Sequence, residues 1–154
     1  MAEQVQGAEG MKLLLVDDEE RFRTTLAKRM QEKGIDVNTL DSGISALQYI
    51  QDQPVDVIVL DIKMPDMDGI ETLNEIKKVN SGIEVILLTG HAAVDSAIEG
   101  MRLGAYDYLM KPCELEELLE KILGAYKTKH ARDVRLHHAE ERSRLDRLEK
   151  SVRF

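Results

Sequence analysis

Short apolar runs alternate with segments of helical periodicity along most of the chain. Runs that end abruptly at polar residues or turn signals are typical of buried parallel strands. We expect five strands, at residues 12–16, 35–40, 55–60, 83–88 and 106–110. After each run, apolar residues recur every three or four positions, which predicts five amphipathic helices. These helices are indicated by Phe22, Leu26 and Met30, by Ile44, Leu47 and Ile50, by Ile70, Leu73 and Ile76, by Val94, Ala97, Ile98 and Met101, and by Leu115, Leu118, Leu119, Ile122 and Leu123.

Helix boundaries are also marked in the sequence. Ser42 stands where the second helix should begin, and serine is a favoured N-cap residue. Gly34 and Gly104 follow the first and fourth helices, where glycine commonly ends a helix. We therefore expect compact β-then-α units with short connections.

Five such units in strict alternation predict an α/β fold, a doubly wound five-stranded parallel sheet with helices on both faces. With the flavodoxin-like strand order 2-1-3-4-5, the first and third strands are neighbours. We expect an N-terminal tail at 1–10, one domain at 11–126 and a charged helical tail or linker at 127–154. Ligands of such folds bind beyond the carboxyl ends of the strands, so the loops there are the place to look for function.

Composition narrows the class of protein. The chain has 154 residues, is 43% hydrophobic and contains a single cysteine, Cys113, which excludes an internal disulfide and fits a reducing, cytoplasmic compartment. Its longest apolar runs are four residues, whereas a membrane span needs roughly 20. We expect no membrane association. Cys113 is interpreted as structural filler.

Charge is distributed unevenly. Residues 1–126 hold 12 basic and 24 acidic residues, whereas residues 127–154 hold 9 basic and 5 acidic ones. Nucleic-acid affinity depends on Lys and Arg that neutralise phosphates, and base stacking needs aromatic residues, of which this chain has few. We therefore expect no direct nucleic-acid binding by this chain.

Polar residues gather where the predicted strands end. Asp17 and Asp18 follow the first strand, Asp61 the third, Thr89 the fourth and Lys111 the fifth. Taken singly, the acids could be helix caps or turn residues. Neighbouring first and third strands would instead bring three carboxylates together, where each pair repels by roughly 3 kcal/mol. Such an all-oxygen cluster favours a hard cation, Mg²⁺ above Ca²⁺, and suits phosphoryl transfer to an aspartate.

Four segments together resemble the receiver domain of two-component response regulators, the chemotaxis-regulator-like family. They are LLVDDE at 14–19, VLDIKMPDMDG at 59–69, LTG at 88–90 and GAYDYLMKP at 104–112. The resemblance covers residues 11 to about 126. Four segments in this order and at these spacings are highly specific.

The resemblance implies a role for each polar residue of the strand ends. Asp61 is the phosphoacceptor, and Mg²⁺ is held by Asp17, Asp18, Asp61 and the main-chain carbonyl of Lys63. Lys111 and Thr89 contact the phosphoryl group, and Thr89 forms a switch pair with Tyr108. Lys63 and His91 occupy positions that tune dephosphorylation, and the bond before Pro112 is cis. A sensor histidine kinase is the implied phosphoryl donor.

Two other functions compete with the phosphorylation switch. A Mg²⁺-dependent phosphatase with an aspartyl nucleophile is disfavoured, because such enzymes carry Asp-x-Asp after the first strand, whereas Asp61 follows the third. A phosphorylation-independent interaction scaffold would not need the complete set of site residues. We therefore expect a non-enzymatic switch.

The tail is the least determined segment. It lacks Gly and Pro and predicts a helix that continues the fifth one. Five of the seven residues at 3,4 spacing are apolar, so a coiled coil and a solvated linker helix both remain open. The fifth helix has an apolar stripe that we expect to exceed what one sheet face covers. A homodimer through the fourth helix, fifth strand, fifth helix and tail is the corresponding prediction.

Overall fold

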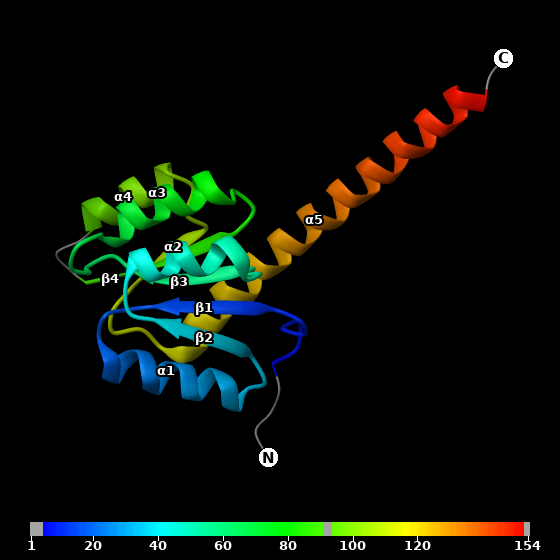
Figure 1. Ribbon diagram of the computed structural model, residues 1–154. Helices are drawn as coiled ribbons and strands as arrows, with labels where there is room; N and C mark the ends of the chain where they lie inside the picture. Colours follow the sequence, from blue (N-terminus) through cyan, green and yellow to red (C-terminus); the bar gives the residue numbers. More distant parts are fainter. Residues whose placement is uncertain (1–4, 91–93, 153–154) are drawn as a thin grey trace.

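The computed structural model describes residues 5–90 and 94–152. It contains one parallel sheet in the order β2-β1-β3-β4-β5 (Figure 1). The strands are β1 (Lys12–Val16), β2 (Asp36–Leu40), β3 (Val57–Asp61), β4 (Glu84–Thr89) and β5 (Asp107–Met110). The helices are α1 (Glu20–Glu32), α2 (Gly43–Asp52), α3 (Gly69–Val79), α4 (Val94–Arg102) and α5 (Leu115–Val152). The predicted fold class and strand order are confirmed.

Alternate residues of each strand face opposite sides of the sheet, which produces two cores. Leu13 and Leu15 of β1 pack with α1 and α5 on one face. Leu14 and Val16 pack with residues of α2, α3 and α4 on the other. Because both faces are covered, the central strands are apolar along most of their length, and this is why they appear in the sequence as continuous apolar runs.

The predicted helix boundaries are confirmed at three positions. Ser42 Oγ accepts a hydrogen bond from the Ser45 amide at 3.1 Å and caps α2. Gly34 and Gly104 have φ values of 83° and 105°, a left-handed conformation that other residues rarely adopt. Glycine therefore allows the chain to turn sharply after α1 and α4.

The apolar stripe of α5 is used differently from the prediction. Leu118, Leu119 and Ile122 are buried, and Leu115 and Leu123 are partly buried against the same core. The expectation that this stripe exceeds what the sheet can cover is therefore wrong. The larger exposed apolar side chains of α5 lie in its extension, at Val134, Leu136, Leu145, Leu148 and Val152.

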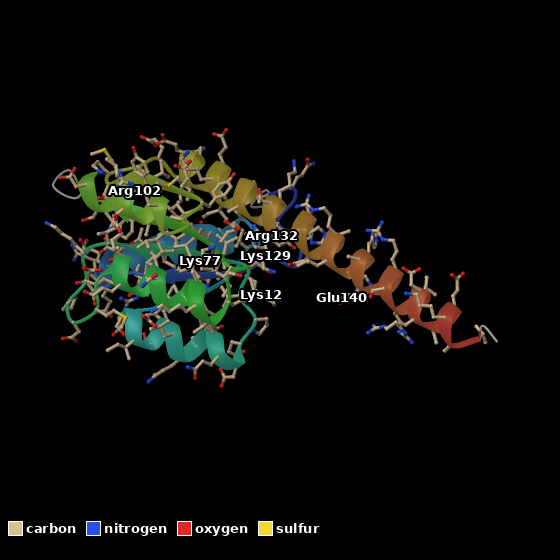
Figure 2. The ribbon with its side chains drawn as sticks, turned by 90° about the horizontal axis from the view of Figure 1, so that it is seen from above. Lys12, Lys77, Arg102, Lys129, Arg132 and Glu140 are labelled. Carbon is tan, nitrogen blue, oxygen red and sulfur yellow. The ribbon has the colours of Figure 1, made fainter. Side chains whose placement is uncertain are left out.

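The extension of α5 projects away from the sheet (Figure 1), but its first turns are attached to the domain. Arg132 pairs with the carboxylate of Glu84, the buried first residue of β4, and donates to the Gly82 carbonyl. Lys129 pairs with Asp56 at 3.0 Å. Figure 2 shows Lys129 and Arg132 where the helix leaves the domain. Contacts of the domain thus continue beyond residue 126, where the charge distribution changes sign.

The N-terminal side is attached in a similar way. Ala8 is buried in the core, and the Tyr126 hydroxyl donates to the Glu9 carbonyl at 3.1 Å. Within the described ranges, no helix combines the length and the apolarity needed to cross a bilayer.

We expect Arg132→Ala to lower the free energy of unfolding by about 1 to 3 kcal/mol, because it leaves the buried Glu84 carboxylate without its charged partner. Arg135→Ala is the matched control, since Arg135 is exposed on the same helix, and its effect should stay within about 0.5 kcal/mol. Urea unfolding of the full chain measures both. Equal stability of the two variants would show that the Arg132 contact does not hold the helix to the domain.

Candidate functional site

The register of the sheet explains why distant residues meet at one edge. Val16 pairs with Leu60, so Asp17, which follows β1, and Asp61, the last residue of β3, lie beside each other. Asp61 itself pairs with Leu88 of β4, which Thr89 follows. Thr89 in turn pairs with Met110, the residue before Lys111. The carboxyl ends of four strands therefore place all the predicted polar residues along a single edge.

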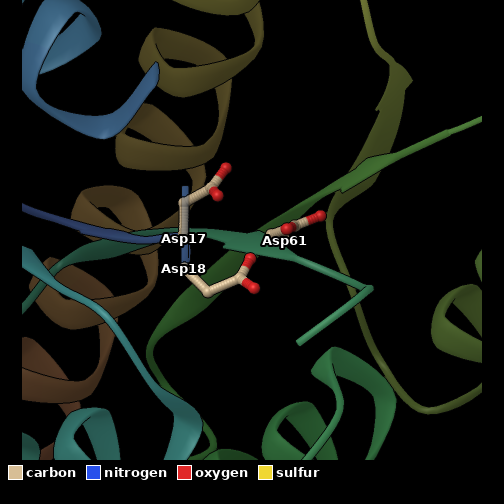
Figure 3. Close-up of side chains that lie close together, drawn as sticks. All are labelled: Asp17, Asp18 and Asp61. Atoms are coloured by element: carbon tan, nitrogen blue, oxygen red, sulfur yellow. The ribbon is translucent and has the colours of Figure 1, made fainter. Parts of the chain in front are cut away.

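Three carboxylates form the centre of this edge. Asp17 and Asp61 are buried and Asp18 is exposed, and one oxygen from each lies within 4.8 Å of the others (Figure 3). An all-oxygen donor set with one solvent-facing member fits a small hard cation that keeps some of its water ligands, as Mg²⁺ does. The cluster therefore matches the metal-binding chemistry expected from the sequence.

The environment of Asp61 favours its protonated form when no metal is present. Burial is the main cause, and the charge of Asp17 adds to it, while Lys111 acts in the opposite direction. Together they raise the pKa of Asp61 from 3.8 to about 7. A bound cation would reverse this effect, because it favours the ionised carboxylate.

Lys111 provides a positively charged side chain at the site. Its ammonium donates to Asp17 Oδ2 at 2.8 Å and lies 3.7 Å from Asp61 Oδ2. Burial lowers the pKa of Lys111, but the hydrogen bond to Asp17 and the charges of Asp61 and Asp17 outweigh it, so the pKa is raised overall. The side chain is therefore a fixed positive charge beside the predicted phosphoacceptor.

The start of α3 packs closely behind Asp61. A Cβ atom at Gly69 would lie 2.4 Å from the Asp61 carbonyl oxygen, a distance that no real side chain could tolerate. Asp68 caps the helix by accepting from the Glu71 amide at 2.9 Å. The Asp-Gly pair at 68–69 thus holds the loop after β3 close to the site, and Gly69 is required for that approach.

The predicted switch residues lie on neighbouring strands. Thr89 is fully buried, and its hydroxyl donates to the Gly90 carbonyl at 3.0 Å. Tyr108 is partly buried against the core on the α2, α3 and α4 side. Among the described residues, no hydrogen bond joins the two side chains.

The remaining predicted residues are placed as follows. The Lys111–Pro112 bond is cis. The Lys63 side chain is exposed, and its backbone lies beside Asp61, to which it contributes a hydrogen bond. His91 lies outside the described residues. Cys113 is partly buried, and burial raises the pKa of its thiol, so its environment favours the neutral form.

An open groove of about 450 Å³ leads to the acidic cluster from the side of α4. Its lining joins the loop after β3 to the start of α4 and consists of Asp18, Ile62, Lys63, Met64, Pro65, Asp68 and Ser96. The cluster is therefore open to solvent past Asp18 and Lys63.

Sequence comparison agrees with this geometry. Residues 13–123 match the family model of the response regulator receiver domain. The chain belongs to the response regulator receiver family. Receiver domains are generally non-enzymatic switches of two-component systems, and phosphoryl acceptance is implied by that membership.

Known receiver proteins resemble this chain in both sequence and structure. Regulatory protein AtoC of Escherichia coli (strain K12) is 39% identical over 107 residues, which are 70% of this chain and 23% of that protein. Transcriptional regulatory protein ZraR of Klebsiella oxytoca is 38% identical over 110 residues, 71% of this chain and 25% of that protein. This chain therefore corresponds to about a quarter of the length of these relatives.

Solved structures extend the comparison. A response regulator receiver domain protein from Clostridium thermocellum superposes with a TM-score of 0.75 at 34% identity, covering 79% of this chain and 98% of that one. NtrX from Brucella abortus gives 0.74 at 31% identity, covering 79% of this chain and 28% of that one. The receiver fold thus accounts for most of the chain.

Two residues near the site were not expected from the sequence. The ring of Phe22 lies under the Lys111 ammonium, and Arg23 donates to the Asp17 carbonyl at 2.6 Å. Phe22 was interpreted as an ordinary core position of the first helix. The signal that could have revealed both is their place in the first turn of that helix, within six residues of Asp17.

Proposed function

We propose that this receiver accepts a phosphoryl group on Asp61 from a sensor histidine kinase, with Mg²⁺ as cofactor, and thereby changes a surface that controls a downstream partner or output. The observation that carries the proposal is the meeting of three carboxylates with Lys111 at one strand edge. Mg²⁺ would be held by Asp17, Asp18, Asp61 and the main-chain carbonyl of Lys63. The single cysteine supports a cytoplasmic location. Transcription is the proposed output, because ZraR, one of the relatives, is named as a transcriptional regulatory protein.

In the proposed reaction, an oxygen of the Asp61 carboxylate attacks the phosphorus of a phosphohistidine. The new O–P bond forms as the P–N bond breaks, and the imidazole leaves with the bonding electron pair. A bound Mg²⁺ would supply positive charge that stabilises the transferred phosphoryl oxygens. Lys111 stands within reach of the same oxygens, and Asp17 holds its ammonium in place.

Release of the phosphoryl group is proposed to depend on residues at the entrance of the site. The exposed Lys63 side chain lines the groove that leads to Asp61, where it can affect the approach of water. His91 is assigned the same tuning role by its position in the sequence.

We propose that Thr89 couples phosphorylation of Asp61 to the change at the surface. Its hydroxyl would exchange the Gly90 carbonyl for a phosphoryl oxygen and bias the position of Tyr108 on the adjacent strand. The surface that responds would be the face of α4, β5 and α5, where Ile98 and Met101 are exposed. A weak homodimer through this face, extended by the apolar residues of the tail, is the proposed active assembly.

Thr89→Ala is expected to separate phosphoryl binding from its transmission. Beryllofluoride, a phosphoryl mimic, should still bind with Mg²⁺ about tenfold more weakly, because one hydrogen bond is lost. Light scattering at saturating mimic should show a dimer for the wild type and for the exposed control Thr39→Ala, but a monomer for Thr89→Ala.

Two results would contradict separate parts of the proposal. A wild type that binds the mimic and keeps its monomer mass contradicts the dimer. A Thr89→Ala variant that dimerises like the wild type contradicts the switch role of Thr89.

A further inference from the structure

The Lys111 ammonium has three close neighbours. Two are the carboxylates of Asp17 and Asp61, at 2.8 and 3.7 Å. The third is the ring of Phe22, whose centroid is 4.3 Å from Nζ. This distance is within the range of a cation–π contact, in which the negative face of an aromatic ring attracts an ammonium.

The ring of Phe22 is itself held in place. Phe22 lies in the first turn of α1 and packs against the core shared by α1 and α5. The same turn is attached to the site by two hydrogen bonds, from the Glu19 amide to Asp17 Oδ1 at 2.9 Å and from Arg23 to the Asp17 carbonyl. Asp17 therefore fixes both the lysine and the helix turn that carries the ring.

We propose that Phe22 is a positioning residue for Lys111 and that it acts through the face of its ring. Lysine has a flexible four-carbon stem, so a contact with the ring in addition to the two carboxylates limits where its ammonium can lie. The ring holds Nζ close to Asp61, where a phosphoryl oxygen would meet it. This inference rests on the proposed function, because it assigns Phe22 to the same phosphoryl site.

Phe22 also has a packing role, and the test must separate the two. Together with Leu26, Cys113, Leu115 and Leu118 it lines a groove of about 410 Å³ between α1 and α5. Phe22→Leu keeps an apolar side chain in that groove and removes the ring, whereas Phe22→Tyr keeps the ring. Leu26→Val is the control for packing alone, since Leu26 lines the same groove and is buried in the same core.

The first readout is the NMR resonance of the Lys111 ε-methylene protons. A ring beneath the side chain should shift these protons upfield in the wild type, in Phe22→Tyr and in Leu26→Val. Phe22→Leu should return them to the position of an ordinary lysine. An unshifted wild-type resonance, or one unchanged in Phe22→Leu, would overturn the inference.

The second readout is the affinity for beryllofluoride with Mg²⁺. Phe22→Leu should weaken binding by about three- to tenfold, while Phe22→Tyr and Leu26→Val should change it by less than about twofold. In a Lys111→Met background, Phe22→Leu should have no further effect, because the ring acts through the lysine. Equal weakening by Leu26→Val would assign Phe22 to packing and overturn the inference. A wild type that binds no mimic would contradict the proposed function, and the Lys111 resonance would still decide the role of Phe22.

Discussion

Asp61→Asn should abolish phosphorylation of this chain by small-molecule donors and by a histidine kinase. The amide removes the nucleophilic carboxylate and one anionic oxygen of the cluster, so neither attack on phosphorus nor full cation binding is retained. Intact mass after incubation with Mg²⁺ and acetyl phosphate measures the effect. Asp66→Asn is the matched control, because Asp66 is an exposed residue of the loop that follows β3, and it should be labelled like the wild type. Full labelling of Asp61→Asn at a single site would place the phosphoacceptor elsewhere.

The second large predicted effect is on the free energy of unfolding, which should depend on pH when no metal is bound. Burial and the Asp17 charge raise the pKa of Asp61 to about 7 in the folded chain, whereas the unfolded value is near 3.8. Between these values the folded chain binds a proton that the unfolded chain does not, so stability falls as the pH rises and becomes constant above about 7. The full cost of ionising Asp61 in the folded chain is up to about 4 kcal/mol.

This cost can be isolated by comparing the wild type with Asp61→Asn in the presence of a chelator. The variant should be the more stable of the two, and its advantage should grow by about 2 to 3 kcal/mol from pH 5 to pH 8. Saturating Mg²⁺ should remove much of that advantage, because it binds the folded wild type and favours the ionised carboxylate. Urea unfolding at both pH values measures the difference. A pH-independent difference would mean that Asp61 is ionised normally in the folded chain.

The sequence predicts much of the fold because each signal it uses is local. Continuous apolar runs identify the buried strands, Ser42 marks the start of α2, and Gly34 marks the end of α1. Strict alternation of strands and helices then restricts the topology to a parallel sheet, whose carboxyl edge collects the polar residues. The sequence alone therefore groups Asp17, Asp61 and Lys111.

What the sequence could not predict depends on how helices are rotated and packed. The contact between Phe22 and Lys111 needs the register of α1 against the sheet, and a phenylalanine at helical spacing is typical of a core residue. The pair of Arg132 and Glu84 joins residues 48 positions apart, one in a segment that has the composition of a solvated helix. The α5 stripe was misjudged for the same reason, since its coverage depends on how the helix lies on the sheet.

The proposed function also explains why an unfavourable arrangement of charge is retained. Two buried aspartates beside an exposed third make the metal-free site costly, and the same cluster provides the oxygen ligands and the nucleophile that the proposed reaction requires. Stability and activity are therefore expected to oppose each other at Asp61, as they commonly do at functional sites.

Intact mass spectrometry of the full wild-type chain, treated with acetyl phosphate in Mg²⁺ or in a chelator, tests the central claim most directly. We expect one phosphoryl group per chain with Mg²⁺, a sharply reduced amount without it, and loss of the adduct in base, as an acyl phosphate requires. Peptide mapping should then locate the group on Asp61. No adduct with Mg²⁺, or one phosphoryl group that maps to another residue, would contradict the assignment of Asp61 as the acceptor.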